Sequence, residues 1–299
     1  MSPADGALAG PDPVYETRSV PRGRRTPVRC YLPQLDVRIE AALGTYNEDC
    51  RWDLIDGILS ECPDDVLIAG TSLIKRENDR ERTLGADILG RLATLDPGAR
   101  PVIRESLLAA LARKHDGPAL ASIVAALGHL GDPETLGQIV RQADSSSPEV
   151  RLAVAFAIAT ISPQPLDGEA RSALIVLSRD DDPEVRDWAT FGLGTLSTDD
   201  GPDVVAALLA RADDASHEAR AEALFGLAVR HDPRAVPHLI RALQSPLAGG
   251  LEVDAAAAAA DPRLLPALWA LRQTGAQDEV RLRRAIDRCS GSDRPAYLT

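Results

Sequence analysis

The sequence has few aromatic residues, few cysteines and no long apolar run. Aromatic residues make up 3% of its 299 residues, whereas alanine and leucine dominate, and this composition favours helices over strands. The four cysteines (Cys30, Cys50, Cys62 and Cys289) form no CxxC pair, which argues against a zinc site or a disulfide scaffold. No run of about 18 apolar residues and no secretory signal is present. We therefore expect a cytoplasmic protein without a membrane span.

Recognised catalytic motifs are missing as well. The chain has no glycine-rich dinucleotide fingerprint, no phosphate-binding loop, no HExxH zinc motif and no GxSxG nucleophile elbow. We therefore predict no catalytic residue, no metal site and no cofactor.

Positive charge is also scarce. The chain has 33 basic and 45 acidic residues, a formal net charge of −12. Duplex nucleic acid and anionic membranes both require a dense cationic surface, so neither is expected as a partner. A basic protein surface is the favoured partner, because opposite charge speeds and orients association.

Composition divides the chain into four parts. Residues 1–30 are rich in proline and arginine and predict a disordered tail, and residues 291–299 predict a flexible end. Within residues 31–62, apolar spacing predicts one helix from about Leu35 to Leu43 and a second from about Cys50 to Ser60. This pair is interpreted as a helical cap or atypical repeat, and residues 63–290 as a repeat array.

The array shows a period of 34 or 35 residues. An arginine marks each clear copy, at Arg151, Arg186, Arg220 and Arg281, and a phenylalanine follows the first three by five positions, at Phe156, Phe191 and Phe225. Asp-Pro pairs recur at Asp132, Asp182, Asp232 and Asp261, where aspartate can cap a helix and proline suits its first position. Each unit therefore predicts two helices, which bury their apolar faces by stacking on neighbouring units.

A 34-residue helix pair with Asp-Pro, Pro-Glu-Val-Arg and a Leu-Gly segment resembles the HEAT repeat, of the short bacterial type also found in phycobilisome lyases. The resemblance implies an all-α, right-handed solenoid of about six or seven helix pairs. It also implies that the repeat arginine pairs with an aspartate of a neighbouring unit. The predicted structural ladder consists of Arg151, Arg186 and Arg220 with Asp180 and Asp213, and Asp144, Asp181 and Asp214 are further candidate acceptors.

Two enzymatic alternatives follow from the same resemblance. His217-Glu218 looks like the metal-binding unit of HEAT-type deoxyhypusine hydroxylase, but that family needs four such pairs and this chain has one. A lyase or lyase subunit of the phycobilin type would need a pigment pocket, which nothing in the sequence marks.

The candidate binding surface is the concave face lined by the second helices. Stepping 100° per residue from Arg186 places Trp188 opposite the packed arc, so we expect it to be partly exposed in a groove. Asp187 and Glu222 lie on the same arc and give the groove negative charge. Phe191 flanks it, on the side where repeats touch. We therefore predict a non-catalytic scaffold or adaptor, including an inhibitor or immunity protein, that binds a partner through Trp188, Asp187, Phe191 and Glu222.

Overall fold

The computed structural model describes residues 35–291, except residues 114, 116, 163–165, 167 and 276. These residues form sixteen α-helices and no strand, arranged as eight consecutive helix pairs. The predicted tail (1–30) and most of the predicted flexible end (291–299) lie outside the described residues. The pair in residues 31–62 and the seven pairs after it agree with an all-α solenoid.

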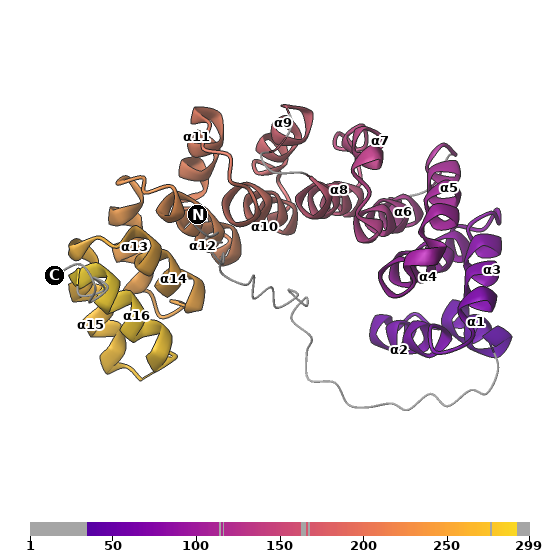
Figure 1. Cartoon of the computed structure of the whole chain (residues 1–299), viewed down its shortest axis with the longest axis horizontal. Coiled ribbons are helices and arrows are strands. Elements are labelled where there is room, and N and C mark those ends of the chain that lie inside the picture. The colour runs from indigo at the N-terminus through magenta and orange to yellow at the C-terminus, as the bar shows by residue number, and fades with distance from the viewer. Residues whose placement is uncertain are drawn as a thin grey trace, which may run out of the picture.

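The helices form two rows along an arch (Figure 1). The odd-numbered helices form the outer row: α1 Leu35–Gly44, α3 Pro63–Leu73, α5 Arg100–Leu111, α7 Leu136–Val140, α9 Gly168–Leu177, α11 Pro202–Arg211, α13 Ala235–Leu243 and α15 Leu265–Gln273. The even-numbered helices line the concave side: α2 Glu48–Ile58, α4 Asp79–Leu95, α6 Gly117–Leu130, α8 Pro148–Ile161, α10 Pro183–Phe191, α12 His217–Val229, α14 Gly250–Ala259 and α16 Glu279–Ser290.

Polar caps begin most of the inner helices. The side chain of Asp182 accepts hydrogen bonds from the backbone N–H groups of Glu184 and Val185, and Pro183 occupies the first helical position of α10. Asn47, Asn78, Ser147, Ser216 and Asp278 cap α2, α4, α8, α12 and α16 in the same way. These caps satisfy backbone donors that a helix cannot pair internally, so each of these six inner helices begins at a fixed residue.

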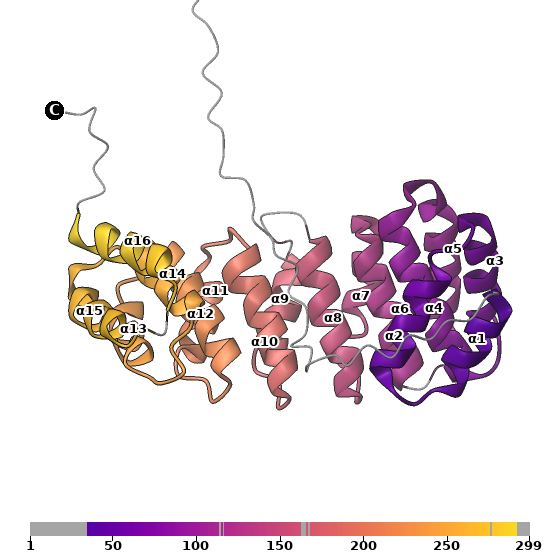
Figure 2. The ribbon, with the colours of Figure 1, turned by 90° about the horizontal axis from the view of Figure 1, so that it is seen from below.

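Small residues let neighbouring inner helices approach closely. A Cβ atom built at Gly90 would lie 2.9 Å from the Cα of Ala126, and one at Gly226 would lie 2.5 Å from the Cα of Gly194. The apolar core runs without interruption from Ala42 to Cys289. The inner helices α4, α6, α8 and α10 thus pack side by side and form a continuous concave surface (Figure 2).

A π-helical turn, Gly192–Leu196, extends α10. The sequence predicts one helix as far as Leu196, and the chain is indeed helical to that residue, but its last turn is widened. The guanidinium of Arg230 donates hydrogen bonds to five backbone carbonyls around this turn, those of Leu193, Gly194, Ser197, Asp199 and Gly226. Arg230 therefore satisfies carbonyls that the widened turn leaves without a regular helical partner.

Candidate partner-binding groove

A row of aromatic side chains crosses three inner helices. The ring of His129 on α6 lies 5.0 Å from that of Phe156 on α8, which lies 5.2 Å from Trp188 on α10. Trp188 and Phe191 are 5.6 Å apart, and both contacts of Trp188 are edge-to-face. This geometry is the one that aromatic pairs prefer, so the rings of the row stabilise one another and form a continuous aromatic surface.

A groove of about 400 Å³ adjoins this row. Five inner helices contribute to its walls, from α2 to α10, and its floor is formed by small residues of α4 and α6. Phe156, Trp188 and Leu152 form an apolar side. The groove therefore has the size and lining of a site that accepts side chains of another molecule.

The opposite side of the groove carries a buried carboxylate. The side chain of Asp87 is 8% exposed, and its Oδ2 lies 3.1 Å from Nη1 of Arg51. The side chain of Ser122 lowers the pKa of this carboxyl group. Burial raises the pKa of Asp87 to about 6, while Arg51 acts in the opposite direction. The desolvation of Asp87 thus outweighs its attraction to Arg51, so burying the ionised carboxylate costs folding free energy.

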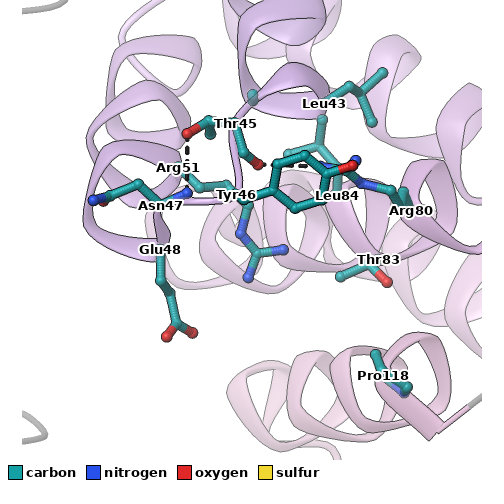
Figure 3. Close-up of a pocket in the computed structure, with 11 residues that line it drawn as sticks. Leu43, Thr45, Tyr46, Asn47, Glu48, Arg51, Arg80, Thr83, Leu84 and Pro118 are labelled. Atoms are coloured by element: carbon teal, nitrogen blue, oxygen red, sulfur yellow. Dashed lines mark hydrogen bonds between the residues drawn. The ribbon is translucent and has the colours of Figure 1, made fainter.

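A second hollow, of about 310 Å³, lies where α1 turns into α2 (Figure 3). The guanidinium of Arg80 lies 4.3 Å from the ring centre of Tyr46 and donates a hydrogen bond to the carbonyl of Thr45. Glu48 and Arg51 line this hollow and the groove alike. The two cavities therefore adjoin at the first turn of α2.

Trp188 lies in the groove, half-buried, at the end of the aromatic row. Phe191 and Asp187 are also partly exposed on α10. Glu222 lies elsewhere than expected: it is 2% exposed, and its carboxylate accepts a hydrogen bond from the hydroxyl of Thr195. The prediction that Glu222 faces the groove is wrong, because the widened turn of α10 brings Thr195 against α12.

The arginine ladder joins successive loops. Arg151 forms a two-pronged ion pair with Asp180, at 2.6 and 2.7 Å. Arg186 binds Asp214 in the same way, at 3.1 and 3.0 Å. Arg220 departs from the prediction: it donates to the backbone carbonyl of Asp214, six residues earlier in its own unit, and no carboxylate among the described residues forms an ion pair with it.

Asp213 is not the ladder acceptor, contrary to the sequence-based expectation. Its carboxylate instead pairs with Arg241 and His238 on α13. Asp214 takes the ladder position because it is the residue whose carboxylate is buried, 3% exposed, beside Arg186 and Arg211.

His217 contacts a carboxylate other than that of Glu218. Its Nε2 lies 2.9 Å from Oε1 of Glu252, and the other carboxylate oxygen, Oε2, accepts a hydrogen bond from the N–H of Gly249. Among the described residues, no group of three or more histidine, cysteine, aspartate or glutamate side chains is placed to hold a metal ion. In the same part of the chain, no helix has both the length and the apolar character needed to cross a bilayer.

Sequence reasoning missed Asp87, Ala125 and Trp52, all of which line the groove. A signal for two of them was present. Asp87 and Ala125 lie three residues before Gly90 and Gly128, as Phe191 lies three residues before Gly194. Aligning the repeats on these glycines would have shown that two units lack the repeat phenylalanine.

Comparison with known proteins gives matches to repeat proteins. A family model of HEAT repeats matches residues 104–194, 137–228 and 170–260. The protein YibA of Escherichia coli K12 is 30% identical over 160 residues, 54% of this chain and 55% of YibA. The chain thus spans about half the length of the curated relatives it matches.

Solved structures show a similar fold. An X-ray structure of Escherichia coli YibA has a TM-score of 0.69 at 23% identity, covering 85% of this chain and 92% of YibA. The CpcE–CpcF complex of phycocyanin lyase from Nostoc has a TM-score of 0.48 at 15% identity, covering 79% and 89%, a likeness too low to bear on function. The family matches together span more than half of the sequence, and the chain belongs to the HEAT repeat family.

Proposed function

We propose that this repeat protein is a non-catalytic scaffold that binds a partner protein along its concave groove. The observation that carries the proposal is the half-buried Trp188, which stands with Phe156 and Phe191 beside a groove of about 400 Å³. Tryptophan in a partly desolvated hollow is a frequent anchor of protein interfaces. Solenoids of this kind present extended concave surfaces that suit such binding.

Charge supports a basic partner. The chain carries a net charge of −12, and Glu48, Asp87 and Glu149 line the groove with two arginines, Arg51 and Arg91. Both arginines are held by ion pairs with acidic side chains. Because both arginines are already paired with acidic side chains, neither leaves unbalanced positive charge in the groove. A partner with a basic surface would therefore gain complementary contacts there.

The test is affinity capture with Trp188→Ala, read by mass spectrometry and followed by calorimetry with the captured protein. We expect a partner bound by the wild type and lost, or weakened at least tenfold, in the variant. Trp269→Ala is the matched control, since Trp269 is 46% exposed on the outer helix α15. Undiminished binding by Trp188→Ala, or equal loss with both variants, would overturn the proposal.

Thermal unfolding of the same two variants separates binding from folding. Trp188→Ala removes two edge contacts worth about 0.5–1.5 kcal/mol each, so a cooperative transition with the melting temperature lowered by no more than about 10 °C is expected. A collapse of the fold would make Trp188 a core residue rather than a binding residue.

A further inference from the structure

Five consecutive inner helices share one repeat position, which lines the groove on α4, α6 and α8. It lies three residues before a glycine or alanine in each helix, namely Gly90, Gly128, Ala159, Gly194 and Ala228. In chain order, this position is occupied by Asp87 on α4, Ala125 on α6, Phe156 on α8, Phe191 on α10 and Phe225 on α12. Three consecutive helices thus carry a ring there, and the two before them do not.

The missing ring at Ala125 leaves a hollow. On the next helix, the ring of Phe156 covers Gly128, because a Cβ atom at Gly128 would lie 2.7 Å from its Cε1. The corresponding phenyl ring over Gly90 would come from residue 125, which is alanine; the His129 ring borders this space instead, with its Cδ2 3.5 Å from a Cβ atom built at Gly90. Gly90, Ala125 and Ala126 all line the groove instead. We call this part of the groove the Ala125 hollow, with Ala121 as its fourth floor residue.

The two ends of the Ala125 hollow differ chemically. Phe156 and Trp188 close one end with aromatic faces and edges. Asp87 closes the other end, and its Oδ2 is buried without a hydrogen bond from any described residue, although Arg51 lies 3.1 Å away. Glu48 and Glu149 add negative charge to the rim. An occupant that suits this hollow has a flat shape, an apolar stem and a positively charged donor group.

We propose that the Ala125 hollow receives an arginine side chain of the partner protein; this rests on the proposed function. The methylene stem of arginine lies over the alanine floor, and its guanidinium fits between aromatic side chains and the Asp87 carboxylate. Arginine suits this arrangement better than lysine, because its planar group stacks on rings and donates in a fixed direction.

The probe is acetyl-arginine-amide, followed by NMR through the indole N–H signals of the full chain. Trp52 and Trp188 line the groove, whereas Trp269 on α15 serves as an internal control. We expect concentration-dependent shifts of the first two signals and none for Trp269. Acetyl-citrulline-amide has the same shape without the charge and should bind at least tenfold more weakly.

Two variants locate the binding. Ala125→Phe supplies the missing ring, which should cover Gly90 as Phe156 covers Gly128, and should abolish the response without lowering the melting temperature. Asp87→Asn should weaken the response at least tenfold. Val176→Phe adds the same ring at an exposed position of the outer helix α9 and should change nothing.

Several results would overturn the proposal. These are an equal response to citrulline amide, a stronger response to the amides of acetyl-lysine or acetyl-tyrosine, or an unchanged response in Ala125→Phe. A response seen only after Arg18, Arg22, Arg24, Arg25 and Arg29 are changed to glutamine would assign the hollow to the chain's own N-terminal tail, residues 1–30. If Trp188→Ala abolishes partner binding while Ala125→Phe does not, the scaffold function stands and the arginine assignment falls.

Discussion

At the scale of single residues, two aspartates show opposite effects of burial. Burial raises the pKa of Asp87 from 3.8 to about 6, whereas Arg151 lowers that of Asp180 through hydrogen bonds. The folded structure thus disfavours the ionised form of Asp87 and favours the ionised form of Asp180. A charge kept at a cost is typical of binding residues, because natural proteins trade stability for function.

Asp87→Asn is expected to stabilise the protein at pH 8. The folded chain binds the Asp87 proton more tightly than the unfolded chain, so its contribution to stability falls as pH rises from about 4 to about 6 and stays low above that. Removing the charge should raise the free energy of unfolding by about 1–3 kcal/mol at pH 8 and by little near pH 4. Urea unfolding at both values tests this, and a less stable variant at pH 8 would contradict it.

Asp180→Asn should act in the other direction. Its lowered pKa means that the pair with Arg151 stabilises the fold above about pH 3.8, and that this contribution is lost as pH falls through the folded-state pKa. The partners are 8% and 19% exposed, so breaking the pair should cost about 1–3 kcal/mol at pH 7. The same urea titrations measure this loss, and a variant as stable as the wild type would show that the pair contributes nothing.

At the scale of helices, the sequence predicts those features that depend on neighbours along the chain. The Asp182-Pro183 start of α10, the helix pair of residues 31–62 and the arginine period all follow from short-range spacing. The burial of Glu222 does not, because a helical wheel treats each helix alone. The π turn at Gly192–Leu196 changes the helical phase and brings Thr195 to Glu222, a contact that no single-helix periodicity contains.

In the groove too, some features follow from neighbours along the chain and others depend on how helices pack. Trp188 could be placed on the concave face because its own helix has a clear apolar arc. The Ala125 hollow could not be predicted in this way. An alanine at residue 125 is unusual only in comparison with the phenylalanines at the same repeat position of the following helices. Whether its space is filled depends on which ring covers which glycine, and this is a property of two packed helices.

Arg230→Met tests how the π turn is held. Its guanidinium donates to carbonyls of the π turn, α12 and the loop between them, and burial lowers its pKa. Methionine keeps the stem and leaves those carbonyls unpaired, so we expect a loss of about 2–4 kcal/mol in the free energy of unfolding. Arg241→Met is the control, because Arg241 is 56% exposed and its surface pair with Asp213 is worth about 0–1 kcal/mol. Equal losses in thermal or urea unfolding would refute the bracing role of Arg230.

At the scale of the whole molecule, charge and groove act over different distances. The net charge of −12 creates a field around the entire array, whereas the Ala125 hollow acts only on a side chain that has entered it. Long-range attraction changes the rate of association, and short-range contacts change the rate of dissociation. The two contributions can therefore be measured separately on one complex.

For the captured partner, we expect the association rate constant to fall at least tenfold between 0.1 and 1 M salt. The Debye length shrinks from about 10 Å to about 3 Å over this range, which removes steering by distant acidic residues. The dissociation rate should change less with salt, because the Asp87 contact is buried.

Ala125→Phe should give the reverse pattern, with a faster dissociation and a nearly unchanged association. Surface plasmon resonance yields both constants. An association rate insensitive to salt would show that the net charge of the array does not guide its partner, even if the groove binds it.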